Sequence, residues 1–361
     1  MEKRPDYFLL GVISSLVILG LFMIASIGVV MSQQEFGQTY YFFKKQLFNG
    51  VFLGIIVGFI CYKMPNKLWK KIAPLVLLAG VALLLVVFIP GVGVKLGGAR
   101  RWVALGPLFF QPAELFKLAF IIYLASWLDR RRELIKSKKD PILPFIIIMG
   151  ISAGLIIKQP DMGTAVVIIF TGVIMYIAGG VSLKNLGILG MTGIVGLVSA
   201  IKIAPYRMQR LMVFFNPTID TQKSGYQLHQ AKIALGSGGI FGLGLGQSKQ
   251  KFNYLPEPIG DSIFAVIGEE LGVIGALAVV ILFVIFIIRG LRVAKNATDG
   301  FSQLLAVGIV GWISSQALVN IAALTGLAPL TGIPLPFISY GSSALVALGA
   351  GSGILLNISK K

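Results

Sequence analysis

The sequence predicts an all-α polytopic membrane protein of about ten transmembrane helices, with both termini cytoplasmic and a large extracytoplasmic loop between helices 7 and 8. Of its 361 residues, 56% are hydrophobic and only 13% are charged. A soluble domain could not bury so much apolar surface, whereas a bilayer accepts it. A spanning helix needs roughly 17–25 mostly apolar residues. Runs of about this length cover 8–30, 46–62, 72–90, 113–128, 142–157, 162–178, 186–204, 262–288, 303–324 and 342–358.

The individual runs differ in length and flanks. The first follows Lys3 and Arg4, but it is too long for a signal peptide and no A-x-A-like cleavage site follows it, so it is expected to remain as a span. The run 113–128 is short and interrupted by charge, whereas 262–288 is long and predicted to be tilted. Several runs are rich in glycine, which favours close packing of helices in lipid.

The distribution of lysine and arginine predicts the orientation, because cytoplasmic loops carry an excess of both. With the N-terminus in the cytoplasm, every inner segment is basic. The inner charges are Lys3, Arg4, Lys63, Lys67, Lys70, Lys71, Arg130, Arg131, Arg132, Lys136, Lys138, Lys139, Lys184, Arg289, Arg292, Lys295, Lys360 and Lys361. We therefore expect one membrane domain, 1–361, and assign these charges to topology rather than to chemistry.

Composition also limits the function. A net charge of +18 would indicate nucleic acid on a soluble protein, but here it favours lipid headgroups and a phosphorylated lipid substrate. Cys61 is the only cysteine, which excludes disulfides and thiolate metal sites. His229 is the only histidine, which excludes an HExxH zinc site and a Ser-His-Asp triad.

Three outer segments remain as places for chemistry: 91–112, 202–261 and 325–341. The middle one is the only long hydrophilic stretch, and it is basic against the predicted orientation. Its basic residues include Lys202, Arg207, Arg210, Lys223, Lys232, Lys249 and Lys251. Long translocated loops escape the positive-inside rule. The alternative is a basic cleft that holds a phosphate-bearing ligand.

The first outer segment contains two candidate pairs. Glu114 and Lys117 are three residues apart on a predicted helix, so they can form an ion pair. Charged residues at the membrane boundary are functional candidates, although a structural pair that locks two helices together is an equal alternative. Arg101 beside Trp102 fits a guanidinium that binds phosphate next to an interfacial ring, or a plain interface anchor.

The second and third outer segments contain the other local features. Asp161 is predicted to cap the helix that follows it, and to pair with Lys158. The segment 225–235 is predicted to be a short surface helix. The glycine-rich run 236–246 lacks the Gly-Lys-Ser/Thr end of a P-loop, so nucleotide binding is not expected. The proline-containing segment 325–340 is interpreted as the wall of a cavity.

Carboxylates gather where the long loop enters the eighth span. Glu257, Asp261, Glu269 and Glu270 fall within nineteen residues. A helix N-terminus and nearby lysine and arginine would keep Asp261 ionised and able to act as a base, and the alternative is an N-cap. Glu269 lies about 80° round the helix from Asp261, so it could line the same cavity.

Six segments carry a resemblance to a known family: GARRW, QPAELFK, KQPDMGTA, GYQLHQAKIALGSGG, YLPEPIGDSIFAVIGEELG and PLTGIPLPFISYGSS. In this order, and over nearly the whole chain, they resemble the signatures of the SEDS family, the FtsW/RodA/SpoVE-type bacterial cell-wall polymerases. The resemblance implies ten spans and a glycosyltransferase that polymerises lipid II at the outer face of the cytoplasmic membrane. The long loop is most similar to the FtsW branch, which acts in division, with the RodA branch of elongation close behind.

The resemblance also assigns residues. The family's essential aspartate, in the pattern LPE-x-x-x-D, falls on Asp261, its QPxExxK pair on Glu114 and Lys117, and its GAxRW arginine on Arg101. Gly260 and Ser262 stand where the family usually has threonine and phenylalanine, and Ser342 stands in place of a glycine of SYGGS. Because Asp261 is retained, these departures concern local shape and partner contacts.

The predicted mechanism is attack by a sugar 4-hydroxyl of one lipid II on the anomeric carbon of the growing chain, with Asp261 as general base. The substrate-binding set is Arg101, Trp102, Glu114, Lys117, Arg207, Arg210, Lys249, Glu257 and Glu269. A divalent cation, Mg²⁺ or Mn²⁺, could share the charge of the pyrophosphate, although the sequence contains no recognisable metal site. The expected partners are lipid II, the nascent glycan strand, a class B penicillin-binding protein and other division or elongation proteins, but no nucleic acid. The alternatives are a lipid II flippase and a scaffold that recruits a transpeptidase.

Overall fold

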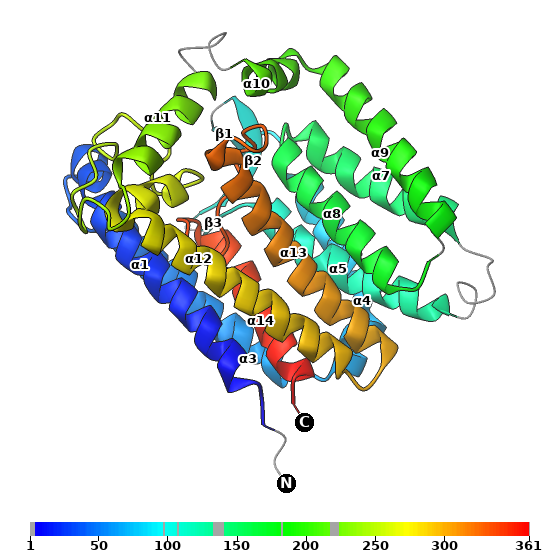
Figure 1. Ribbon diagram of the computed structural model, residues 1–361. Helices are drawn as coiled ribbons and strands as arrows, with labels where there is room; N and C mark the ends of the chain where they lie inside the picture. The colour runs from blue at the N-terminus through cyan, green and yellow to red at the C-terminus, as the bar shows by residue number, and fades with distance from the viewer. Residues whose placement is uncertain are drawn as a thin grey trace.

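The computed structural model describes residues 4–96, 98–106, 108–132, 141–181, 183–216 and 224–360. The predicted inner charges Lys3, Lys136, Lys138, Lys139 and Lys361, and the loop residue Lys223, lie outside these ranges. The helices are α1 (Tyr7–Phe36), α2 (Tyr41–Lys45), the π-helix η1 (Gln46–Phe52), α3 (Leu53–Lys63), α4 (Asn66–Val86), α5 (Pro112–Arg130), α7 (Ile142–Lys158), α8 (Met162–Ala178), α9 (Leu183–Ile203), α10 (Pro205–Phe215), α11 (Ser224–Ser237), α12 (Ile263–Lys295), α13 (Gly300–Thr325) and α14 (Ser342–Ile358) (Figure 1).

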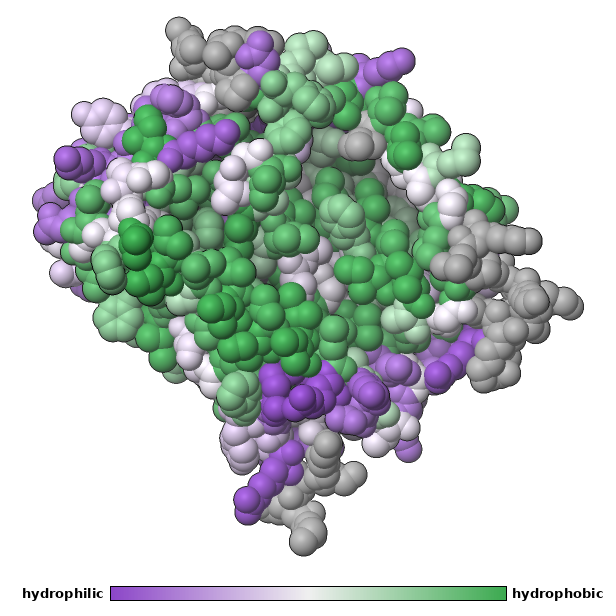
Figure 2. All heavy atoms as spheres, viewed as in Figure 1, coloured by the Kyte–Doolittle hydropathy of each residue, from purple (hydrophilic) through white to green (hydrophobic). Residues whose placement is uncertain are grey.

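Every predicted apolar run coincides with a helix in the structure, although the run 72–90 extends past the end of α4 at Val86. The second run belongs to a continuous helical stretch made of α2, η1 and α3, and the long eighth run is α12, with 33 residues. Five helical stretches are long and apolar enough to cross a bilayer, namely α1, α2 to α3, α4, α12 and α13, and shorter apolar helices lie beside them. Apolar side chains cover the middle of the face seen in Figure 2, with hydrophilic ones towards its two ends. The protein is an integral membrane protein.

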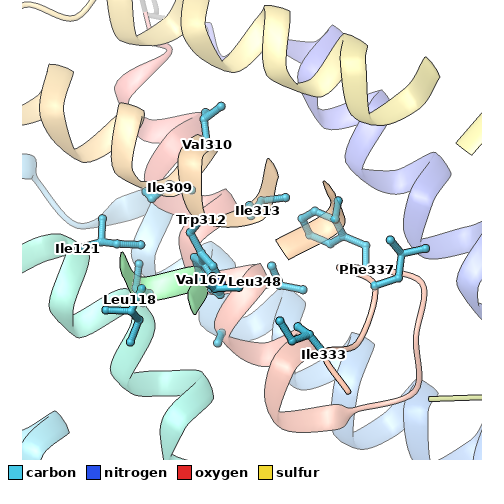
Figure 3. Close-up of a cluster of buried hydrophobic side chains, with 14 of the residues drawn as sticks. Leu118, Ile121, Val167, Ile309, Val310, Trp312, Ile313, Ile333, Phe337 and Leu348 are labelled. Carbon is cyan, nitrogen blue, oxygen red and sulfur yellow. The ribbon is translucent and has the colours of Figure 1, made fainter. Parts of the chain in front are cut away.

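The core of the bundle is built around α13. This helix packs against α5, α8, α12 and α14, and most of its side chains are buried. Trp312 is fully buried and lies among Leu118 of α5, Val167 of α8 and Leu348 of α14 (Figure 3). Apolar contact on nearly all sides makes α13 the fixed element against which the polar segments at one end are placed.

Glycines bring α3 and α14 together, as the glycine-rich sequence predicted. A Cβ atom on Gly58 would lie 2.8 Å from the carbonyl oxygen of Gly349, and one on Gly353 would lie 2.0 Å from that of Gly58. A side chain at these positions would push the two backbones apart, so only glycine permits this approach.

The segment between α4 and α5 folds into a small antiparallel sheet that was not predicted. Its strands are β1 (Gly93–Leu96), β2 (Ala99–Leu105) and β3 (Leu108–Phe110), in the order β1-β2-β3. The register pairs Val94 with Trp102 and Val103 with Phe110. This sheet carries Arg101 and Trp102 over the end of the bundle that lies away from the two chain ends (Figure 1).

The long loop between α9 and α12 contains two more helices, α10 and α11. The predicted surface helix 225–235 is present as α11. Of the apolar residues on one of its faces, Leu228 and Ala231 are buried and Leu235 is half-buried. A glycine-rich series of turns follows and returns to α12, where the backbone N–H of Leu243 donates to the carbonyl of Glu269. At Gly272 the backbone of α12 leaves helical geometry, with φ of 67°. This interruption separates the first turns of α12 from the rest of the helix.

Candidate active site

A polar cavity of about 300 Å³ lies at the end of the bundle away from the chain termini. Segments far apart in the sequence form its wall: β2, the first turns of α5 and α8, the turn before α12, and the segment between α13 and α14. The lining residues are Arg101, Trp102, Gln111, Glu114, Asp161, Thr164, Glu257, Gly260, Asp261, Gly332, Ile333, Pro334, Tyr340, Gly341, Ser343 and Ala344. The interpretation of the segment 325–340 as a cavity wall is confirmed by four of these residues.

Asp261 is held by backbone bonds on both sides. The Asn320 side-chain amide of α13 donates to the carbonyl of Asp261 at 2.7 Å. The Ser339 hydroxyl donates to the carbonyl of Gly260 at 2.7 Å, and the N–H of Tyr340 donates to the carbonyl of Ile259 at 2.8 Å. The position of the carboxylate is therefore set by α13 and by the segment before α14.

The alternative that Asp261 is only an N-cap does not match the helix that follows. The N-cap of α12 is Ser262, and no side chain caps this helix. The Asp261 carboxylate instead faces the cavity, where the Gln227 amide of α11 lies 3.3 Å from each of its oxygens. A carboxylate in this place is available for contact with a ligand.

The electrostatic surroundings raise the pKa of Asp261 to about 6. Burial is the largest cause and the nearby Glu257 carboxylate adds to it, while the Gln227 hydrogen bonds and the Arg210 charge act in the opposite direction. The sequence predicted that basic neighbours keep this group ionised. In the structure burial has a larger effect on the pKa than these neighbours, so the pKa is raised and not lowered. A carboxyl with a pKa of about 6 is still mostly ionised at pH 7.

Glu114 and Lys117 form the predicted ion pair. The Lys117 ammonium lies 2.9 Å from the Glu114 carboxylate and donates to Oε1 of Gln316 at 2.7 Å. It also lies 5.1 Å from the centre of the Trp312 ring. Glu114 is 3% exposed and lines the cavity, whereas Lys117 is 1% exposed and is not among the lining residues. The predicted direct contact of Lys117 with substrate is therefore corrected: the ammonium lies behind Glu114 and holds it.

Arg101 is tied to the turn that precedes α8. Its guanidinium donates from Nε to the carbonyl of Gln159 at 3.2 Å and from Nη2 to the carbonyl of Pro160. Since a guanidinium has five N–H donors, these two bonds fix its plane and leave others for a ligand. Trp102 stacks on Phe109 of β3 with ring centres 4.8 Å apart. The sheet thus presents a cation and a flat ring to the same cavity.

Asp161 is the predicted N-cap. Its carboxylate accepts the backbone N–H of Thr164 at 3.0 Å and the Thr164 hydroxyl at 2.9 Å. The Gln111 amide donates to it at 3.3 Å. The prediction of a cap is confirmed, and the cap also links the starts of α5 and α8 within the cavity wall.

Two predicted arginines of α10 lie near the cavity without lining it. Arg210 donates to the carbonyl of Leu330 at 3.1 Å, and burial lowers the pKa of its guanidinium while the charge of Asp261 raises it. Arg207 is buried and donates to the carbonyl of Ile157 at 3.2 Å. Arg210 therefore acts on Asp261 through its charge, while Arg207 anchors α10 to the end of α7.

The prediction that Glu269 lines the cavity is wrong, whereas substrate binding by Lys249 stays a prediction. Glu269 is 1% exposed and accepts from the Ser248 hydroxyl and from the backbone N–H groups of Lys249 and Gln250. It therefore lies beneath the glycine-rich turns and not beside Asp261 in the cavity. Lys249 is exposed on that turn and is not a lining residue.

The whole chain matches known proteins. A family model described as "Cell cycle protein", which covers FtsW, RodA and SpoVE, matches residues 7–361. The chain belongs to the FtsW/RodA/SpoVE family. It is 39% identical to stage V sporulation protein E of Bacillus subtilis over 360 residues, which covers 99% of this chain and 98% of that protein. It is 40% identical to a probable peptidoglycan glycosyltransferase FtsW of Nitrosococcus halophilus over 359 residues, covering 98% and 92%.

Solved structures of similar proteins share the fold. One is a chain of a peptidoglycan synthase complex that coordinates polymerization and crosslinking, with a TM-score of 0.80, 25% identity and coverage of 98% of this chain and 97% of that one. Another is the rod shape determining protein RodA of Thermus thermophilus, with a TM-score of 0.71, 26% identity and coverage of 98% and 96%. The chain is thus a member of a peptidoglycan glycosyltransferase family that acts in cell division or cell shape.

Sequence reasoning missed several neutral residues of the site in this family member. Gln227 donates to the carboxylate of Asp261, and Asn320 donates to its backbone carbonyl. The Thr164 hydroxyl donates to the carboxylate of the N-cap residue Asp161. Gln227 stands in the GYQLHQ segment and Gln111 in QPAELFK, but an amide without a charge gave no signal of its own. These residues were recognisable only once the elements had been placed together.

Proposed function

We propose that this protein polymerises lipid II into glycan strands, with Asp261 as the general base. The observation that carries the proposal is a carboxylate with its pKa raised to about 6 in a cavity that also contains Arg101 and Glu114. A general base works best when its pKa lies near the operating pH, because it must be ionised and still accept a proton.

In the proposed reaction, a sugar 4-hydroxyl of one lipid II attacks the anomeric carbon of the growing chain. An oxygen of the Asp261 carboxylate accepts the hydroxyl proton as the new C–O bond forms. The bond between the anomeric carbon and the undecaprenyl diphosphate breaks, and its electron pair leaves with the diphosphate. The family match and the glycosyltransferase names of the relatives support this reaction type.

The negative charge of the departing diphosphate requires cations nearby. Arg101 lines the cavity with unused N–H donors, and Arg210 lies close enough to influence the pKa of Asp261. Glu114, held by Lys117, orients donors of the substrate on the other side. We assign Trp102 to stacking against a sugar face.

A divalent cation, Mg²⁺ or Mn²⁺, stays a prediction. Among the residues that the structure describes, no group of three or more His, Cys, Asp or Glu side chains is arranged to hold a metal ion. The proposed mechanism therefore uses protein side chains only. Polymerisation in excess EDTA, compared with added Mg²⁺ or Mn²⁺, tests the dependence on metal.

We place the reaction at the outer face of the cytoplasmic membrane. The two chain ends lie together at one end of the molecule (Figure 1), and the cavity is at the other. The basic inner segments assign the terminal end to the cytoplasm. A class B penicillin-binding protein, and other division or elongation proteins, would act on the glycan strands that this protein makes. The similarity to a chain of a peptidoglycan synthase complex supports a complex with such a partner.

The test uses purified protein in detergent with fluorescent lipid II. Strands made without a membrane to cross identify a polymerase and exclude a protein that is only a flippase or a scaffold. Asp261→Asn should give no strands. The matched control is Asp299→Asn, at the N-cap of α13, where asparagine also caps well. Retained polymerisation by Asp261→Asn, at the control level, removes Asp261 from the mechanism.

A further inference from the structure

A second, apolar groove runs along α1 and is separate from the polar cavity. Its volume is about 590 Å³, and its walls are α1, α3 and α14 together with Phe337. Along α1 it extends from Pro5 to Leu21, roughly 24 Å at the helical rise of about 1.5 Å per residue. Half of a hydrocarbon core is about 15 Å thick, so the groove is long enough for an acyl chain of one leaflet.

The groove exists because α3 and α14 pack tightly on each other while α1 stands apart. Gly54, Gly58 and Gly353 lie in its floor, where they allow the two helices to touch. On the opposite wall Leu10 and Ile18 are 40% and 53% exposed. The result is an open apolar groove between α1 and the α3–α14 pair.

Two lysines mark the end of the groove near the chain termini. The Lys63 ammonium lies 5.4 Å from the centre of the Phe59 ring, and the Lys360 ammonium lies 3.7 Å from that of Tyr62. Both rings line the groove. Burial and the charge of Lys63 lower the pKa of Lys360, so the two cations face the same region. The Lys360 ammonium also donates to the carbonyl of Tyr62 at 3.1 Å. Within the described part of the chain neither lysine pairs with a carboxylate, so their charges leave this mouth attractive to an anion.

Ser352 places a polar atom in the mostly apolar wall, beside the hydroxyl-bearing side chains Tyr7, Ser14 and Tyr62. Ser352 of α14 lines the groove and is 5% exposed, and its hydroxyl has no hydrogen-bond partner. An unpaired buried hydroxyl is costly, so a ligand oxygen that the Ser352 side chain reached by rotating towards the groove would be stabilising. Ser352 lies six residues before the end of α14, roughly 9 Å along the helix, which is within reach of the ester oxygens of a lipid.

We propose that this groove binds one anionic glycerophospholipid from the leaflet on the side of the chain termini. One acyl chain lies along α1, an ester oxygen approaches Ser352, and the phosphate lies beside Lys63 and Lys360. The cationic mouth is at the end opposite the Asp261 cavity, which argues against the polyprenyl tail of a substrate whose diphosphate sits in that cavity.

The test is native mass spectrometry of the purified, delipidated chain with added phosphatidylglycerol or phosphatidylcholine of the same acyl composition. The wild type should retain one phosphatidylglycerol in preference to phosphatidylcholine. Each lysine near an anionic headgroup contributes about a factor of five, so Lys63→Gln with Lys360→Gln should reduce the preference roughly 25-fold. The matched control is Lys67→Gln, an exposed lysine of α4 at the same end of the molecule.

A second pair of variants tests the groove itself. Ser14→Phe with Ile18→Trp fills it from the exposed face of α1 and should abolish retention of the lipid, whereas Leu78→Trp, on the exposed face of α4, should not. Equal retention of both lipids, an unchanged preference after removal of the two lysines, or a lipid retained by the filled groove would overturn the proposal. Displacement of phosphatidylglycerol by equimolar undecaprenyl phosphate would overturn it in favour of the substrate tail.

Discussion

Replacing Asp261 by asparagine should abolish polymerisation and at the same time stabilise the fold at pH 7. The structure raises the pKa of this carboxyl from 3.8 to about 6, mainly by burial, so folding disfavours its charged form. For an acid shifted upwards, the favourable contribution is complete below pH 3.8 and is lost as the pH rises through about 6. At neutral pH the wild type therefore carries a cost that asparagine, which is always neutral, does not.

The magnitude follows from the shift. One pKa unit corresponds to about 1.4 kcal/mol, so the rise from 3.8 to about 6 is worth roughly 3 kcal/mol at most. Because one side of the carboxylate faces the cavity and its water, the gain expected at pH 7 is about 1–3 kcal/mol. Such a change raises the midpoint of thermal unfolding by a few degrees.

The assay is thermal unfolding of the wild type and Asp261→Asn in the same detergent at pH 7 and at pH 4, alongside strand synthesis from lipid II. The midpoint of the variant should be higher at pH 7, and the two proteins should converge at pH 4, where the wild-type carboxyl is protonated in the fold. A variant that is less stable at pH 7, or a difference that is the same at both pH values, would refute the assignment of a buried and costly charge.

The remaining predictions concern neighbours of this carboxylate. Glu257→Gln removes a repelling charge and should move the acid limb of the pH–rate profile below pH 6. Gln227→Leu removes hydrogen-bond donors that stabilise the ionised carboxylate and should move this limb above pH 6. The measurement is the rate of strand synthesis between pH 5 and pH 8. Glu114→Ala leaves the buried Lys117 ammonium without its carboxylate and should cost about 3–5 kcal/mol in thermal unfolding, part of which Glu114→Gln with Lys117→Met recovers. Asp161→Ala removes a helix cap and should cost about 1 kcal/mol, whereas Asp161→Asn should cost less.

Each of these predictions has an outcome that contradicts it. If the acid limb of the pH–rate profile stays in place, or moves in the same direction in both variants, then ionisation of Asp261 does not control the rate. Additive losses in the double-mutant cycle of Glu114 and Lys117 would show that the pair contributes no coupling energy. Equal loss with alanine and asparagine at Asp161 would assign its effect to something other than the cap.

The helices could be predicted because a lipid environment leaves the backbone few choices. Backbone polar groups in the hydrocarbon must be satisfied within the helix, so an apolar run of sufficient length predicts a helix almost directly. The predicted runs 162–178 and 342–358 match α8 and α14 to the residue. The run 46–62 was located correctly, but its π-helical stretch η1, which packs against α14 and α1, was not predicted.

The small sheet could not be predicted for the opposite reason. Its strands are only 4, 7 and 3 residues long, and they pair as consecutive short hairpins at the polar end of the bundle. Arg100, Arg101 and Trp102 give the central strand no alternating pattern of apolar and polar residues. Short strands of this kind carry little periodic signal.

The site was predictable only to the extent that charge made its residues visible. Asp261 and Glu114 stood out as carboxylates in an apolar chain, and both line the cavity. Glu269 stood out in the same way, but helical spacing alone does not show which loop packs against a given side of a helix. The turn that contains Ser248 packs over Glu269, and the Ser248 hydroxyl donates to its carboxylate. Glu269 therefore anchors this loop and does not face the cavity.

The segment between α13 and α14 connects the two sites of the molecule. Tyr340 lines the polar cavity, while Phe337, three residues earlier, lines the apolar groove. Phe337 adopts a φ of 66°, which is costly for a side chain of this size, so packing on both sides must hold the backbone in place. The Ser339 hydroxyl then donates to the carbonyl of Gly260, directly before Asp261. The position of the base and the shape of the groove therefore depend on one short stretch of backbone, and a lipid in the groove packs against the element that positions the carboxylate.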